Sequence, residues 1–140
     1  MKLEIELKTE TVRTYALSRA IVALFAAHDL YDRAFVSSFD PRFLYYVRDE
    51  EPRIVTALAL LERPPYGAVT EFLMRREGVA DFLGVGIIEP ERSLATGEFI
   101  ERWQHRGRVL NVWTVNAERD KTFYRRRGLS ITTDCPASGC

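Results

Sequence analysis

The chain opens with an unbroken alternation of apolar and charged residues, Lys2-Leu3-Glu4-Ile5-Glu6-Leu7-Lys8. This period of two predicts a β-strand in which successive side chains point to opposite faces. One face would then be apolar, and the other would carry Glu4, Glu6 and Lys8.

The charged face of the strand has two interpretations. A solvated edge strand shows the same alternation, so the pattern alone does not place this face. On an enclosed face, neighbours about 7 Å apart would interact by roughly 2 kcal/mol at an effective dielectric near 20. Glu6 would then feel nearly equal repulsion from Glu4 and attraction from Lys8. The face would keep one net negative charge, which allows a metal site with oxygen ligands and a lysine that meets phosphate.

Length and composition predict one globular domain with a real core. The chain has 140 residues, of which 46% are hydrophobic and 29% charged, and its formal net charge is zero. A neutral chain gives no electrostatic reason to expect nucleic acid as a partner. The longest apolar run, Ala20–Ala27, is too short to span a bilayer, and early charges argue against a signal peptide. The sequence leaves the localisation open, and Cys135 and Cys140 are expected as free thiols, with a disulfide as the alternative.

Predicted strands alternate with predicted helices along the remaining chain. Later strands are expected at Ala34–Ser37, Ile54–Leu60, Phe82–Ile88, Val109–Thr114 and Leu129–Thr133. Helices are expected from Thr9 or Thr11 to about Asp29, from Asp40-Pro41 onward, and at Val69–Arg76, Leu94–Arg106 and Glu118–Arg127, with stops at Gly78, Gly107 and Gly128. This alternation predicts a parallel α/β sheet with right-handed crossovers. An open doubly wound sheet is the default architecture, although no glycine-rich phosphate loop follows any strand.

Polar and aromatic residues mark the ends of four predicted strands. They form the segments Glu6-Leu7-Lys8, Ser37-Ser38-Phe39-Asp40, Trp113-Thr114-Val115-Asn116 and Thr132-Thr133-Asp134-Cys135-Pro136. This series resembles the E-x-K, S-F-D, W-T-V-N and T-D-x-P patterns of the glycerophosphodiester phosphodiesterase family, in the family's order and over nearly the whole chain. The run Ile54-Val55-Thr56-Ala57-Leu58 further resembles the membrane-associated animal branch of that family.

The resemblance implies a partial TIM barrel. Residues 1–140 would form the carboxyl-terminal part of the domain, with six parallel strands alternating with helices. A complete (β/α)₈ barrel needs about 250 residues. The first two βα units of the barrel would therefore be missing from this chain.

The resemblance also implies a set of site residues. Glu6 matches the family's metal-binding acid, and Lys8 matches the lysine that faces the substrate phosphate. Trp113 and Asn116 match residues that line the pocket, and Asp134 matches the polar residue that closes it. The implied cofactor is a divalent metal, Ca²⁺ or Mg²⁺, bound through carboxylate oxygens. Without the resemblance, Trp113 could equally be a core aromatic, and Asn116 and Asp134 could be helix or turn caps.

The chain departs from the family in its catalytic machinery. The family's first two strands carry H-R-G, E-x-D and H-D, which supply both catalytic histidines and two further metal ligands, and none of these patterns precedes Met1. His105-Arg106-Gly107 and His28-Asp29 match them in letters, but both lie at predicted helix ends, so we assign no catalytic residue. Glu4 also stands where the family often has a smaller polar residue.

Two functions of different classes follow. In the first, the chain belongs to a phosphoric diester hydrolase that acts on a glycerophosphodiester or a lysophospholipid-like substrate, and is inactive alone. In the second, it is a catalytically dead fragment that binds a partner through its open barrel edges. That partner would be a second copy or the missing amino-terminal units. Any membrane association would come only through upstream sequence.

Overall fold

The structure of the chain is a computed structural model that describes residues 3–8, 14–62 and 77–135. Its strands are β1 Leu3–Leu7, β2 Ala34–Ser38, β3 Thr56–Leu60, β4 Ile87–Pro90, β5 Val109–Val112 and β6 Ser130–Ile131. Its helices are α1 Thr14–His28, α2 Pro41–Glu50, α4 Glu77–Leu83, α5 Gly97–His105 and α6 Glu118–Arg126. Strands and helices therefore alternate as the sequence predicts.

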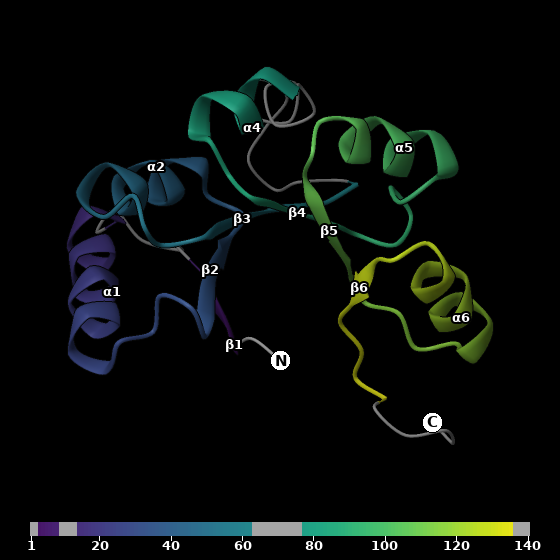
Figure 1. Ribbon diagram of the computed structural model, residues 1–140, viewed down its shortest axis with the longest axis horizontal. Helices are drawn as coiled ribbons and strands as arrows, with labels where there is room; N and C mark the ends of the chain where they lie inside the picture. The colour runs from purple at the N-terminus through teal and green to yellow at the C-terminus, as the bar shows by residue number, and fades with distance from the viewer. Residues whose placement is uncertain (1–2, 9–13, 63–76, 136–140) are drawn as a thin grey trace.

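The six strands form one curled parallel sheet in the order β1-β2-β3-β4-β5-β6. The helices lie along its convex side, whereas the concave side is open between β1 and β6 (Figure 1). This half-barrel confirms the prediction of a partial TIM barrel. The doubly wound default is wrong, because the helices cover one face and the strand order never reverses.

The two faces of the sheet differ in chemistry because side chains alternate along each strand. Apolar side chains on the convex face pack beneath the helices, and they include Val36, Leu58, Ile88, Leu110 and Val112. The helices contribute fully or nearly fully buried partners, among them Phe43, Leu44, Val47, Ile100, Trp103 and Tyr124. Burial of one such large side chain stabilises the fold by about 1.5–3 kcal/mol. The convex face is thus the core, and the concave face carries the polar residues Ser37, Glu89 and Asn111 beside apolar ones such as Phe35 and Ile87.

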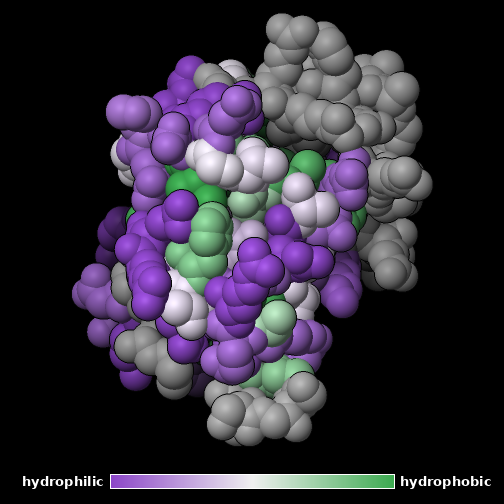
Figure 2. Space-filling view, turned by 90° about the vertical axis from the view of Figure 1, so that its right-hand side faces the viewer, coloured by the Kyte–Doolittle hydropathy of each residue, from purple (hydrophilic) through white to green (hydrophobic). Residues whose placement is uncertain are grey.

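The outer surface of α5 and α6 is mostly polar, whereas Tyr45 of α2 and Phe82 of α4 are exposed hydrophobic residues. Figure 2 shows the side that carries α5 and α6, where hydrophilic residues cover most of the face and hydrophobic ones form small patches. No helix within residues 14–62 and 77–135 is both long enough and apolar enough to cross a lipid bilayer.

The predicted helix starts and stops are confirmed at several positions. Asp40 accepts a hydrogen bond from the backbone N–H of Arg42 (2.9 Å), and Pro41 is the first residue of α2. Helix α5 begins later than expected, after its cap Thr96. Gly107 follows α5 with φ +69°, a conformation that glycine adopts at little cost.

The prediction is wrong between residues 78 and 88. Gly78 lies inside α4 and not at a helix stop, and the segment expected as the start of a strand at Phe82 is the last turn of that helix. Gly84, with φ +60°, ends the helix, and β4 begins only at Ile87. Val79 and Leu83 lie one helical turn apart and pack on the core, so this apolar run fits a helix as well as a strand. The helix expected at Val69–Arg76 lies outside the described residues.

A buried lysine holds the segment that follows β6. The Lys121 ammonium donates to Glu118 Oε1 (2.8 Å) and to the carbonyl oxygen of Cys135 (2.5 Å). Cys135 is disulfide-bonded, so the expectation of a free thiol is wrong for this residue. Cys140 lies outside the described residues.

Two glycines, one in the first turn of α5 and one after its last turn, give a matched test of the role of backbone conformation. In Gly107→Ala, a new Cβ would meet no atom within 4 Å, so the cost is conformational. We expect it to lower the free energy of unfolding by about 1–2 kcal/mol. Gly97 lies in the first turn of α5, also has free space, and has no positive φ. Gly97→Ala should therefore be neutral or stabilise by up to about 1 kcal/mol. Urea unfolding measures both, and equal effects would contradict the assignment of Gly107 as the helix stop.

Candidate functional site

The carboxyl ends of the six strands meet at one edge of the sheet because all the strands run parallel. A pocket of about 520 Å³ lies at this edge on the concave side. Of the residues predicted for the site, four line it: Glu6, Lys8, Trp113 and Asp134. Glu4 lines it as well, so the charged face of β1 faces this pocket. The prediction that the strand ends gather on one side is confirmed.

Lys8 supplies a positive charge at the rim. Its side chain is 72% exposed, and its ammonium lies 4.0 Å from Glu6 Oε1. An exposed ion pair at this distance contributes little to stability, at most about 1 kcal/mol. The ammonium is therefore free to turn toward an anion in the pocket.

An aromatic pair forms one wall of the pocket. The rings of Phe39 and Trp113 meet edge to face with centroids 5.6 Å apart. The indole N–H of Trp113 donates to the backbone carbonyl of Glu89 at 2.8 Å. This hydrogen bond joins Trp113 to β4 and orients its ring, so the residue lies in the pocket wall and not in the convex core.

Asn116 lies outside the pocket lining. Its side-chain oxygen accepts hydrogen bonds from the Thr133 hydroxyl (3.0 Å) and from the backbone N–H of Asp134 (3.1 Å). These contacts tie the segment after β6 to the segment after β5. They match the alternative of a turn cap, and Asn116 thereby positions Asp134 at the edge of the pocket.

A polar group on the concave face was missed by the sequence reasoning. Glu89 is only 1% exposed and accepts a hydrogen bond from the Asn111 amide at 2.7 Å. The same amide donates to Thr132 Oγ1 at 3.1 Å and approaches Glu4 Oε2 at 3.5 Å. The expected fourth strand ended at Ile88, so Glu89 fell outside it. The sequence signal that could have identified it is the carboxylate of Glu89 directly after the two apolar residues Ile87 and Ile88.

Burial controls the acidity of these carboxyl groups. The pKa of Glu89 is raised to about 7, chiefly by loss of hydration; the nearby charges of Glu4 and Glu6 contribute to this rise, and hydrogen bonds from Asn111 and Ser37 oppose it. Burial is also the main reason that the pKa of Glu4 is raised. The inner part of the pocket therefore holds a carboxyl group that is partly protonated at neutral pH.

The described residues do not by themselves complete a metal site. Within residues 3–8, 14–62 and 77–135, no group of three or more His, Cys, Asp or Glu side chains is arranged to hold a metal ion. Ca²⁺ takes about 6–8 oxygen ligands, and Mg²⁺ prefers an octahedron of oxygens. Glu6 offers carboxylate oxygens, and the remaining ligands would come from water, substrate or other polypeptide.

Both histidines lie at helix ends, as expected. His28 is the last residue of α1 and His105 is the last residue of α5, and both are exposed. The Arg33 guanidinium, directly before β2, donates to the carbonyl oxygen of His28 at 2.6 Å. Since each helix end leads into the amino end of the next strand, these imidazoles lie at the edge of the sheet opposite the pocket.

The sequence matches a known family over almost its whole length. The pattern of the glycerophosphoryl diester phosphodiesterase family covers residues 1–138. Among curated proteins, no sequence relative matches the chain.

Solved structures of similar proteins share the fold. A phosphodiesterase from Oleispira antarctica, in complex with the product sn-glycerol-3-phosphate, is 19% identical with a TM-score of 0.80, over 97% of this chain and 52% of that chain. Two glycerophosphodiester phosphodiesterases are also similar. The one from Parabacteroides distasonis is 20% identical with a TM-score of 0.76, over 95% of this chain and 53% of that chain. The one from Thermotoga maritima is 18% identical with a TM-score of 0.66, over 95% of this chain and 54% of that chain. The chain thus spans about half the length of these structures, and identities this low establish the fold alone.

The buried carboxyl group gives a pH-dependent prediction. The Glu89 pKa is higher in the folded chain (about 7) than its ordinary value of 4.5. The folded state therefore holds the proton more tightly, and stability is lost as the pH rises from about 4.5 through 7. Glu89→Gln removes this loss. The parent chain should lose roughly 2–3 kcal/mol of unfolding free energy between pH 5 and pH 8 through this group, and Glu89→Gln should not. The difference in unfolding free energy between the variant and the parent should therefore move in the variant's favour by this amount. Urea unfolding at both pH values measures it, with Glu101→Gln on α5 as the control. An unchanged pH dependence in Glu89→Gln would show that Glu89 is ionised throughout.

Proposed function

Since the chain belongs to the glycerophosphoryl diester phosphodiesterase family, we propose that it is the carboxyl-terminal part of a phosphodiester hydrolase. The reaction would convert a glycerophosphodiester and water into glycerol phosphate and an alcohol. The observation that carries this proposal is the convergence of Glu6, Lys8, Trp113 and Asp134 on one pocket at the carboxyl ends of the strands. In barrels of this kind, that edge carries the chemistry.

Each of these residues has a role suited to its chemistry. The Lys8 ammonium would bind a non-bridging phosphate oxygen, because it is exposed and only loosely paired with Glu6. Trp113 would hold the apolar edge of the substrate, and Asp134 would close the pocket, with Asn116 fixing the backbone of Asp134. The substrate would be a glycerophosphodiester or a lysophospholipid-like diester, consistent with the sn-glycerol-3-phosphate bound to the Oleispira antarctica enzyme. This role would place the protein in lipid metabolism.

A divalent cation, Ca²⁺ or Mg²⁺, would bind through Glu6. When bound, such an ion stabilises negative charge on a phosphoryl oxygen as a Lewis acid. The described residues supply only part of its coordination shell, so the cation would depend on ligands from elsewhere in the complete enzyme. The likeness of Ile54–Leu58 to the membrane-associated animal branch extends the proposal to a membrane-associated full-length protein.

The chain alone should be inactive. Proton transfer by a positioned histidine contributes about 10²–10⁴-fold to a rate, and both histidines of this chain lie at the wrong edge of the sheet. We therefore expect no enzymatic release of glycerol 3-phosphate from a glycerophosphodiester by the purified 140-residue chain, with Ca²⁺ or Mg²⁺ present. Robust turnover that disappears in Glu6→Gln would contradict this expectation.

The coding sequence upstream of Met1 separates the two candidate functions. If it continues in frame into H-R-G and E-x-D, the extended product should hydrolyse the diester, which supports the enzyme. If it does not, the favoured function is a catalytically dead binding module. The structural basis for that second function is the pair of edge strands, because among the described strands β1 pairs only with β2 and β6 only with β5. Such open edges can pair with another polypeptide, either a second copy or separate barrel units.

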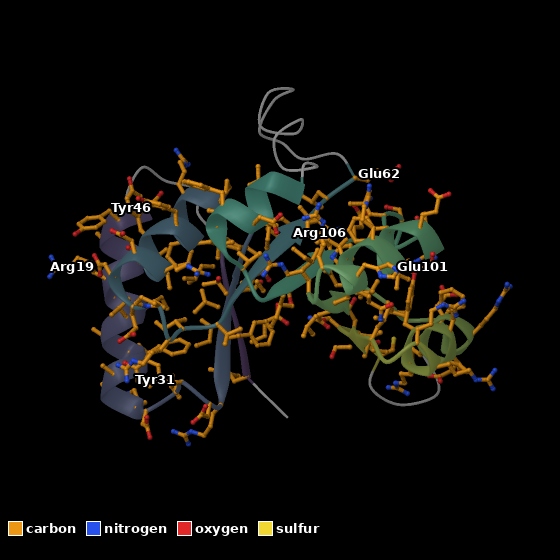
Figure 3. The ribbon with its side chains drawn as sticks, turned by 45° about the horizontal axis from the view of Figure 1, so that its top comes forward. Arg19, Tyr31, Tyr46, Glu62, Glu101 and Arg106 are labelled. Atoms are coloured by element: carbon orange, nitrogen blue, oxygen red, sulfur yellow. The ribbon has the colours of Figure 1, made fainter. Side chains whose placement is uncertain are left out.

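Binding of the product tests the pocket without requiring turnover. We expect sn-glycerol 3-phosphate to shift the NMR signals of residues around the pocket in the isolated chain. Lys8→Ala should weaken this binding by about fivefold to tenfold, the effect of losing about 1–1.4 kcal/mol from one hydrogen bond. Arg19→Ala is the control, because Arg19 is an exposed cation on the outer helix α1 (Figure 3). Equal weakening in both variants would indicate nonspecific attraction and count against the assigned pocket.

A further inference from the structure

The pocket is more acidic than its proposed ligand would suggest. Four carboxyl groups line it, those of Glu4, Glu6, Glu89 and Asp134, whereas Lys8 is its single ammonium among the described residues. A phosphodiester carries one negative charge, and each of these carboxylates repels it. The product of its hydrolysis is a phosphomonoester, which carries nearly two negative charges above its second pKa of about 6. Any fixed carboxylate near the phosphate therefore penalises the product more than the substrate.

Glu89 differs from the other three acidic residues in its burial and in the hydrogen bond that fixes its carboxyl group. Glu6 is 39% exposed and lies beside Lys8, and Asp134 is exposed, so water and a counter-charge weaken their fields. Glu89 is 1% exposed, and the Asn111 amide fixes its carboxyl group at 2.7 Å. Its described hydrogen-bond partners, Asn111 and Ser37, are neutral. A charge in this position cannot turn to solvent and acts through a medium of low dielectric.

We propose that Glu89 is a specificity-determining residue that makes the pocket prefer the singly charged phosphodiester over the doubly charged phosphomonoester. Lys8 attracts both ligands, and the Glu89 carboxylate repels the doubly charged monoester more strongly than the singly charged diester. The pocket would in this way release glycerol phosphate after hydrolysis instead of retaining it. This inference rests on the proposed function, since it assumes that the pocket binds these phosphates.

The experiment compares two ligands at pH 8, where the monoester carries two charges and the Glu89 carboxyl is largely ionised. The diester probe is glycerophosphoglycerol, whose head group is uncharged, and the monoester probe is sn-glycerol 3-phosphate. NMR titration of the 140-residue chain gives a Kd for each, without added metal. The variants are Glu89→Gln, which keeps the shape of the side chain, and Glu4→Gln, which removes the neighbouring carboxyl group. Glu101→Gln, on the outer helix α5 (Figure 3), is the matched control.

We expect Glu89→Gln to tighten monoester binding on the order of tenfold and diester binding by clearly less, so that the ratio of the two Kd values moves several-fold toward the product. Glu4→Gln should change the ratio in the same direction and by less, because this residue is partly solvated. Glu101→Gln should leave the ratio unchanged.

Two results would overturn the inference, and they are distinguishable. If Glu89→Gln is folded, binds both ligands and keeps the ratio of the parent chain, Glu89 does not select between them and the proposed function is unaffected. If the parent chain and the variants bind neither ligand, the proposed function itself fails, and this inference fails with it.

Discussion

The structure depends on parallel pairing between strands that follow one another in the chain. Each strand hydrogen-bonds to the next with a helix crossing back over the same face, as the register of β1 on β2 illustrates from Leu3↔Ala34 to Leu7↔Ser38. This arrangement covers one face of the sheet with helices and turns all carboxyl ends to one edge. The convex core, the open concave face and the position of the pocket all follow from that constraint.

The buried Glu89 carboxyl group on the concave face destabilises the fold and gives the pocket a charged group. Burial of the Glu89 carboxyl is unfavourable when the group is ionised, and the Asn111 amide and the Ser37 hydroxyl offset only part of the cost. An apolar residue at this position would avoid the penalty altogether. When it is ionised, above a pH of about 7, the carboxyl group instead gives the pocket a negative charge that can distinguish phosphates by their own charge. The hydrogen bonds of the Asn111 amide link β5 to Glu89 of β4 and to Thr132, the residue that follows β6.

The sequence predicted the fold well where local signals and tertiary structure agree. The alternation in β1, the Asp40-Pro41 start of α2 and the glycine after α5 each correspond to an element of the structure. The prediction was wrong around Phe82, because a short apolar run fits both a helix and a strand and only packing decides between them. That error displaced β4 and hid Glu89. Glu6, Lys8, Trp113 and Asp134 could be named because they share strand-end motifs, whereas Asn111 belongs to no motif and is recognised only by its neighbours in space.

The strands lie in the sheet in the same order as in the sequence, and this order determines which parts of the chain contact one another. Among the described strands, no pairing closes a loop longer than one βα unit, as the pairing of Leu3 with Ala34 illustrates, so each step of the sheet depends on one crossover. The amide of Asn111 and the carboxylate of Glu4 join opposite ends of the chain through a hydrogen bond of 3.5 Å, at the limit of such interactions. The curvature is therefore set by the twist between successive strands and not by a clamp across the opening. In its contact pattern, the half-barrel resembles a short array of repeats, in which each unit rests on its predecessor and its successor.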